Sequence, residues 1–249
     1  MDKPAAKTPT ANASVSEKMA ILAPLIVIGL IVIGVAVVLG YRALRTTAPS
    51  QRDLAKEAEA ALARQNFRPL SEPLQTLLAD AKYEPIPTQA HSLLLQSAPD
   101  FTLKDVEGKD RSLADYLKTG PVVLVFYYGY HCDHCVSQLF AINKDMEKFR
   151  ELGVHVVAVS ADSIELTRER YKQYGAFKFP VLSDAGNKIA EKYETYTPAT
   201  EALMHGTYVI SRQGKIVWTN RGETPFTENR TLIHKVAEIE ERLAKKAGL

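Results

Sequence analysis

The sequence contains only two cysteines in 249 residues, Cys132 and Cys135. Because they lie three positions apart, no disulfide can connect distant parts of the fold. A closed structural zinc site is not favoured, since it would need two further ligands and the neighbouring His131 and His134 lie too close in sequence to supply them. Covalent haem would need a histidine directly after the second cysteine, where Val136 stands. These absences leave the thiol pair itself as the main functional signal.

The chain also lacks a strong charge of either sign, with 31 basic and 29 acidic residues and a formal net charge of +2. Such a balanced chain creates no extended field that would attract nucleic acid or an acidic partner. We therefore expect no nucleic-acid partner. The hydrophobic fraction of 46% is large enough for a substantial core.

Large apolar residues are almost absent from residues 1–18, which we expect to form a disordered tail. Charged residues are absent from residues 19–41, a run dominated by Ile, Leu, Val, Ala and Gly. As a helix this run would span about 34 Å, enough to cross a hydrocarbon core of about 30 Å. A cleaved signal peptide, whose apolar region is usually about 7 to 15 residues long, fits less well. The sequence predicts one transmembrane helix, with the lipid bilayer as a partner.

The charges that flank this segment leave its orientation open. Positive residues stand on both sides of it, at Lys3, Lys7 and Lys18 before it and at Arg42, Arg45, Arg52 and Lys56 after it. The positive-inside rule therefore finds little asymmetry, and long domains translocate largely regardless of charge. A dithiol as the only cysteine pair suits the neighbourhood of an oxidising space. We expect a single-pass protein of the bacterial inner membrane, with a cytoplasmic N-terminus and a periplasmic catalytic domain.

Residues 42–95 are expected to be a helical spacer or linker. An amphipathic helix is predicted over 50–66, with Ser50 as its cap, and a second short helix over 71–81. The apolar face of the first helix consists of Leu54, Ala58, Ala61 and Leu62. A Pro-containing connection over 83–87 follows. We interpret this region as a spacer that lifts the domain off the membrane, and a dimerisation or docking element is the alternative.

Residues 96–249 show alternating strands and helices. Residues 121–128 form a near-continuous apolar run of the kind buried on both faces of a sheet. Further strands are predicted at 100–103, 111–113, 154–159, 179–182, 207–211 and 215–219, and helices after the cysteines to Phe149 and at 164–174, 187–193 and 227–246. This order predicts an α/β domain with a central sheet covered on both faces.

The cysteine pair lies where the apolar run ends and an amphipathic segment begins. We expect Cys132 at the N-terminus of the following helix, where free N–H groups and the helix dipole would favour its thiolate. His134 between the two sulfurs, and His131 before them, are candidates for tuning the pKa of these thiols. The spacing makes Cys132 the nucleophile and Cys135 the residue that resolves a mixed disulfide.

The combination of motifs resembles the thioredoxin fold, in its peroxiredoxin-like (AhpC/TSA, redoxin) and membrane-anchored branch, over about residues 96–245. The resemblance rests on Ala98–Leu103, Glu107–Lys109, Val122–Tyr127, Cys132–Cys135, Phe179–Asp184 and Tyr208–Ile216. It implies a thioredoxin-like three-layer sandwich with a central mixed sheet. It also implies a thiol-disulfide oxidoreductase with a redox-active Cys132–Cys135 disulfide, extracytoplasmic protein thiols or disulfides as substrates, and a membrane protein as electron donor or acceptor.

Several positions depart from the family patterns. Peroxiredoxins carry a proline and a threonine where this chain has Val125 and Gly129, so thiol peroxidase activity is an alternative and not the main prediction. The position of the cis-proline that faces the cysteines in thioredoxins is aligned with His205, a third candidate for tuning the thiols. Thioredoxin's buried acid is replaced by Phe126.

A second alternative is a copper chaperone without enzymatic turnover. Cys132, Cys135 and His205 resemble the two-cysteine, one-histidine copper site of the membrane-anchored Sco-type chaperones, and soft thiolate ligands suit Cu(I). Our main prediction includes no cofactor and no metal. Tyr127, Tyr128 and Tyr130 form either an apolar rim for a protein substrate or ordinary packing.

Overall fold

The computed structural model describes residues 53–132 and 134–247. The predicted tail, the predicted transmembrane segment and the start of the spacer lie outside these residues. Within the described part, no helix combines the length and the apolar composition needed to cross a bilayer.

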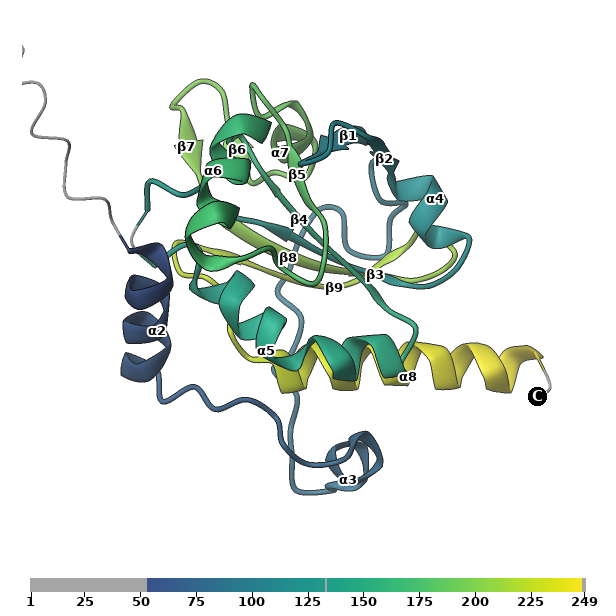
Figure 1. The fold of residues 1–249 in the computed structure, drawn as a ribbon. Helices are drawn as coiled ribbons and strands as arrows, with labels where there is room; N and C mark the ends of the chain where they lie inside the picture. The colour runs from purple at the N-terminus through teal and green to yellow at the C-terminus, as the bar shows by residue number, and fades with distance from the viewer. Residues whose placement is uncertain (1–52, 133, 248–249) are drawn as a thin grey trace, which may run out of the picture. The chain divides into compact units, whose positions relative to one another are not determined.

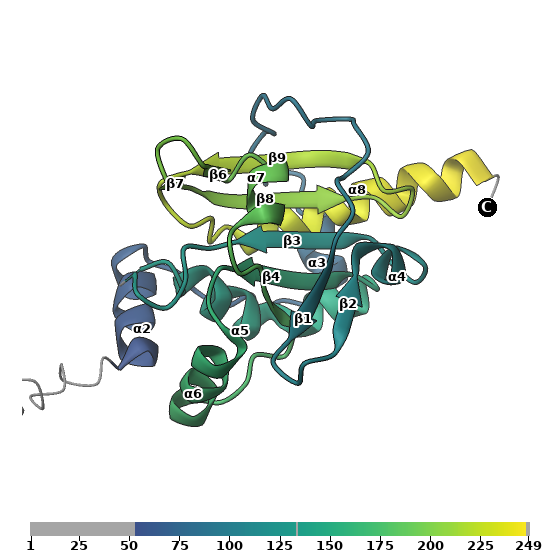
Figure 2. The same cartoon turned by 90° about the horizontal axis from the view of Figure 1, so that it is seen from above.

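The core of the domain is a seven-stranded mixed sheet with the order β2-β1-β5-β4-β3-β8-β9 (Figure 2). Strands β3, β4 and β5 run parallel, and the outer strands pair antiparallel with their neighbours. The strands are β1 (Thr102–Asp105), β2 (Asp110–Ser112), β3 (Val122–Phe126), β4 (His155–Ser160), β5 (Val181–Ser183), β8 (His205–Ile210) and β9 (Ile216–Gly222). The predicted central mixed sheet is confirmed.

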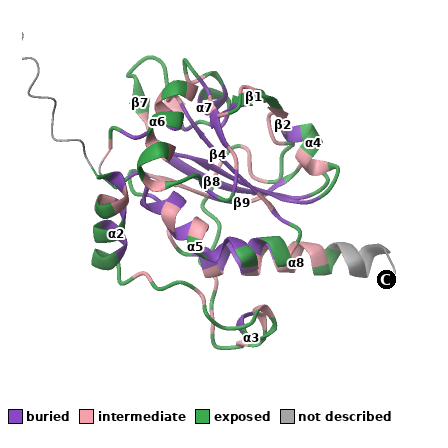
Figure 3. Cartoon of the chain, in the orientation of Figure 1, coloured by how far each residue is buried: buried purple, intermediate pink, exposed green. Residues whose placement is uncertain are grey.

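Helices cover both faces of this sheet (Figure 1). Val123 and Val125 of β3 face a core formed with α5 (Ser137–Glu151), α6 (Ile164–Tyr174) and α8 (Asn229–Ala247). Val122, Leu124 and Phe126 of β3 face a second core, to which α4 (Leu113–Leu117) and α7 (Lys188–Lys192) contribute. Because successive side chains of a strand point to opposite faces, a wholly apolar strand such as β3 requires both layers. Figure 3 shows the resulting buried central strands.

The helix α2 (Leu54–Arg64) packs against the domain. Its predicted apolar face is buried, and Leu54 and Ala58 join the core that contains α5. Asp53, not the predicted Ser50, caps the helix by accepting a hydrogen bond from the Lys56 N–H at 3.1 Å. The apolar stripe thus finds a partner within the same chain, so the structure assigns α2 to the folded unit and not to a separate spacer.

The segment after α3 (Leu74–Ala79) runs along the edge strand β9. Backbone hydrogen bonds join the Gln89 N–H to the Thr219 carbonyl at 2.9 Å and the Ile216 N–H to the Gln96 carbonyl at 3.0 Å. The Trp218 indole N–H donates to the Ile86 carbonyl at 3.0 Å. This segment satisfies backbone groups that an edge strand would otherwise expose. The predicted domain boundary near residue 95 is therefore not a boundary in the tertiary structure.

Two features of the described fold were not predicted from the sequence. Residues 196–197 and 202–203 form a small hairpin, β6 (Tyr196–Thr197) with β7 (Ala202–Leu203). Leu113, predicted to end a strand, instead begins the helix α4, because the Ser112 hydroxyl accepts a hydrogen bond from the Asp115 N–H at 3.1 Å and caps that helix.

Candidate active site

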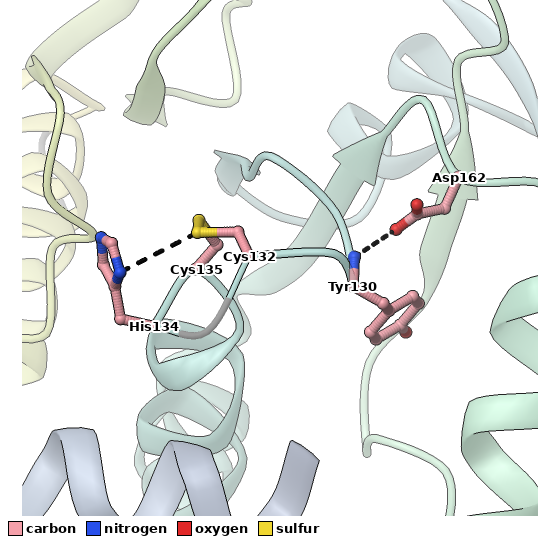
Figure 4. Close-up of a disulfide and its surroundings, with 5 residues drawn as sticks. All are labelled: Tyr130, Cys132, His134, Cys135 and Asp162. Atoms are coloured by element: carbon pink, nitrogen blue, oxygen red, sulfur yellow. Dashed lines mark hydrogen bonds between the residues drawn. A yellow bond between two sulfur atoms is a disulfide. The ribbon is translucent and has the colours of Figure 1, made fainter. Parts of the chain in front are cut away.

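The two cysteines lie in a loop between β3 and α5 and are joined by a disulfide, with their Cα atoms 5.3 Å apart (Figure 4). Cys132 is half-buried, whereas Cys135 is completely buried. Only the first sulfur is therefore placed where a large substrate could reach it. This asymmetry agrees with the predicted order of a nucleophile followed by a resolving thiol.

The start of α5 differs from the expectation. Regular helix begins at Ser137, five residues after Cys132, and residues 134–136 form a turn in which the Ser137 N–H donates to the His134 carbonyl at 3.0 Å. The prediction that Cys132 begins the helix is wrong. Because the helix dipole acts mainly within its first turn, it favours a Cys132 thiolate less than the sequence suggested. Neighbouring side chains could add to the stabilisation of this thiolate.

His134 is the side chain best placed for that role. Its Nδ1 lies 3.9 Å from the Cys132 sulfur, and the ring is exposed to solvent (Figure 4). A protonated imidazole at this place would favour the Cys132 thiolate. His131 is also exposed. The tuning of the thiols by His131 stays a prediction.

His205 begins β8 and lies buried behind His134. Its ring stacks on Tyr128 with the centroids 4.4 Å apart, and the centroid of the His134 ring is 6.3 Å away. Burial, and next the charge of His134, lower the pKa of His205 to about 4, so the imidazole is neutral at pH 7. A neutral ring cannot stabilise a thiolate through charge. The peptide bonds of the described residues are all trans, so a histidine on a trans bond stands where the family pattern suggested a cis-proline.

Neither ring nitrogen of His205 has a hydrogen-bond partner among the described residues. Such a buried polar group costs about 1–3 kcal/mol. We expect His205→Phe, which keeps a ring on Tyr128, to raise the free energy of unfolding by up to that amount, as measured by chemical denaturation. If His205 also tunes the thiols, the pH profile of Cys132 alkylation shifts in the same variant. A loss of stability would show instead that a ring nitrogen is bonded in the folded protein.

The potential metal ligands differ from the predicted set. The ligand atoms of Cys132, His134 and Cys135 lie within 4.8 Å of one another, and His205 is not part of this group. The sequence alternative with His205 as the third copper ligand is therefore not the arrangement that the structure assembles. The reason is local: His134 sits in the same loop as the sulfurs, whereas His205 is held in β8 by its stacking on Tyr128.

Asp162, which the sequence reasoning missed, holds the cysteine loop to the end of β4. Its carboxylate accepts a hydrogen bond from the Tyr130 N–H at 2.9 Å (Figure 4). It also accepts one from the Ser160 hydroxyl at 3.1 Å. Burial raises the pKa of this carboxyl, against the opposing effect of those two bonds. Gly129 has a φ of +108°, and a Cβ there would lie 2.7 Å from the Asp162 Oδ1. The carboxyl ends of the adjacent parallel strands β3 and β4 meet at one edge of the sheet. The position of Asp162 just after β4 could therefore have identified it from the sequence as a residue near the cysteine loop.

The three tyrosines of the loop divide between packing and the site. Tyr127 and Tyr130 are buried in the core, with their rings 5.8 Å apart in an edge-on arrangement. For these two the packing interpretation is correct. Tyr128 is half-buried and lies against His205. It is thus the one tyrosine of the three that borders the candidate site.

The fold and the site together define a thioredoxin-like domain with a Cys-x-x-Cys disulfide. Residues 94–219, about half of the chain, match the AhpC/TSA family. The chain belongs to the AhpC/TSA family.

Two kinds of curated relative match this region. The chloroplastic peroxiredoxin Q of Sedum lineare is 36% identical over 126 residues, which cover 49% of this chain and 67% of that protein. The thiol-disulfide oxidoreductase ResA of Bacillus thuringiensis is 28% identical over 128 residues, which cover 51% of this chain and 69% of that protein. Other relatives are covered less fully, such as the peroxiredoxin Q of Suaeda salsa at 58% of its length.

Solved structures agree on the fold. Peroxidoxin BcpB from Mycobacterium tuberculosis superposes with a TM-score of 0.52 at 23% identity, covering 58% of this chain and 97% of that one. At this identity the likeness shows a shared fold and no more. The comparisons support an oxidoreductase with the Cys132–Cys135 pair, and they include relatives named as peroxiredoxins and as thiol-disulfide oxidoreductases.

Proposed function

We propose that this protein is a membrane-anchored thiol-disulfide oxidoreductase that acts on extracytoplasmic protein thiols or disulfides. The observation that carries the proposal is the asymmetric pair: one disulfide joins a half-buried Cys132 to a fully buried Cys135. Such a pair presents one sulfur to a substrate and keeps the other for the internal step.

The reduction of a substrate disulfide then proceeds in two exchanges. The Cys132 thiolate attacks one substrate sulfur, a mixed disulfide forms, and the other substrate sulfur leaves and takes up a proton. Cys135 loses its proton and attacks the Cys132 sulfur, which re-forms the protein disulfide and releases the second substrate thiol. Two electrons and two protons pass from the protein dithiol to the substrate. Oxidation of a substrate dithiol is the same sequence in reverse.

The membrane setting of this activity rests on the sequence. The uncharged segment at residues 19–41 supports a single anchor in a bacterial inner membrane. The periplasmic side is proposed because a dithiol as the only cysteine pair suits the neighbourhood of an oxidising space. A membrane protein that donates or accepts electrons would then regenerate the pair. Both the anchor and the electron partner are part of the proposal.

A second candidate function is a thiol peroxidase, favoured by the 36% identity to a protein named peroxiredoxin Q. In that reaction the Cys132 thiolate would attack a peroxide oxygen, release water or an alcohol, and become a sulfenic acid. The Cys135 thiol would then attack the sulfenic sulfur, break its S–O bond and release a second molecule, water, as the disulfide forms. Val125 and Gly129 stand where the peroxiredoxin pattern has proline and threonine, which argues for the oxidoreductase as the first choice.

The reduction potential of the Cys132–Cys135 couple tests the proposal and sets its direction. We expect a potential between about −270 and −120 mV in glutathione buffers, with values near the lower end indicating a reductase and values near the upper end an oxidase. Peroxide consumption with a thiol donor is measured on the same sample. Rapid peroxide turnover without insulin-disulfide reduction would replace the oxidoreductase with the peroxidase.

A further inference from the structure

Among the residues of the cysteine loop that the structure describes, Cys132, His134 and Cys135 carry metal-ligating side chains that lie close together. The sulfurs of Cys132 and Cys135 and a ring nitrogen of His134 lie within 4.8 Å of one another, close enough to converge on one ion after small adjustments. His134 already points its Nδ1 at the Cys132 sulfur, at 3.9 Å. This cluster is distinct from the set containing His205, because all of its members belong to one loop.

We propose that the reduced loop is a soft-metal site that binds Cu(I) through Cys132, Cys135 and His134. Two thiolates and one imidazole make a soft donor set, which favours Cu(I) over hard cations. The site does not depend on turnover of the proposed oxidoreductase, because it requires only the dithiol form of the loop.

The oxidation state of the cysteines controls this site. In the disulfide each sulfur is bonded to the other and carries no thiolate charge, whereas thiolates are the form that binds metals. Reduction by a donor dithiol breaks the S–S bond with two electrons and yields two thiols, while the donor becomes a disulfide. Cu(I) then binds as both thiols release their protons to solvent, and copper does not change its oxidation state. When the ion has left, the free dithiol reacts with a substrate disulfide, which is reduced to two thiols while the Cys132–Cys135 bond re-forms, and no thiolates remain to bind the ion.

The exposure of the ligands indicates how a bound ion would exchange. His134 is exposed and Cys132 is half-buried, whereas Cys135 is buried. An ion held by these three would be accessible from the His134 side, so thiols of another protein or of a small molecule could reach it. The same ion would occupy the Cys132 sulfur and block its attack on disulfides. Metal binding and thiol exchange are therefore mutually exclusive states of one loop.

The test is a Cu(I) titration of the full chain under nitrogen, in competition with the chromophoric chelator bicinchoninate. Free thiols are counted first, so that the dithiol and disulfide forms are compared at known composition. We expect one Cu(I) per reduced chain, and at least about a ten-fold weaker affinity in the disulfide form. His134→Asn should weaken binding by the reduced chain by about ten-fold or more.

The control variant is His155→Asn, at the amino end of β4, where the ring contacts the Thr119 hydroxyl at 2.7 Å. It removes a histidine outside the cluster and should bind Cu(I) as the unchanged chain does. Three results would each contradict the proposed site. They are equal Cu(I) affinity of the two redox forms, an unchanged Cu(I) affinity of His134→Asn, and the same loss of Cu(I) affinity in His155→Asn. Insulin-disulfide reduction without copper is measured in parallel, so that failure of the metal site is distinguished from failure of the oxidoreductase.

Discussion

Cys132→Ser is expected to abolish insulin-disulfide reduction, whereas Cys135→Ser should still react once and then accumulate mixed disulfides. The half-buried Cys132 sulfur is the one that a substrate can reach, and a serine hydroxyl is not a nucleophile for disulfides at neutral pH. Cys135 is buried, and in the proposed mechanism it acts only on the Cys132 sulfur. Without it, the first exchange has no internal step to complete it. The measurements are turnover in an insulin assay and non-reducing gel electrophoresis of the trapped species.

The two variants control for each other, because each removes one thiol from the same loop and both remove the disulfide. A change in folding would affect both, whereas the proposed roles predict opposite results for mixed-disulfide accumulation. Normal turnover in either variant would contradict the mechanism. Mixed disulfides that accumulate in Cys132→Ser would show that the roles of the two cysteines are exchanged.

Asp162→Ala is expected to lower both the stability of the domain and the rate of disulfide exchange. The substitution removes the acceptor of the Tyr130 N–H and of the Ser160 hydroxyl. A buried donor left without its acceptor costs about 1–3 kcal/mol, which urea denaturation would measure as a lower free energy of unfolding. The loop would also lose its attachment to β4, so we expect slower exchange at Cys132 and an altered reduction potential.

Two further variants separate positioning of the loop from general destabilisation. Asp162→Asn keeps an acceptor oxygen and should recover most of the exchange rate. Asp105→Ala removes a carboxylate that accepts the Glu107 and Lys109 N–H groups at 2.9 and 3.0 Å in the β1–β2 hairpin. It should cost stability while the reduction potential stays unchanged. An unchanged potential in Asp162→Ala would refute the positioning role.

Much of the scaffold was predictable because its signals are local. The apolar run that forms β3 was long enough to indicate a strand buried on both faces, and the structure buries all five of its residues. The stripe of Leu232 and Val236 likewise identified α8, and both side chains are buried. Strand and helix periods are properties of neighbouring residues, so one sequence suffices to detect them. The spacing of Cys132 and Cys135 was an equally local signal.

The sequence by itself therefore determined the α/β pattern, the redox pair and the AhpC/TSA resemblance, since each depends on residues close together in the chain. Only the tertiary structure decided the surroundings of the pair. It attached the loop to Asp162, started α5 at Ser137, and brought His134, not His205, to the sulfurs. It also buried α2 against α5. The attachment to Asp162 and the burial of α2 join segments that strand pairing and helix packing bring together, which no local period encodes, whereas the place of His134 and the start of α5 depend on the conformation of the loop itself.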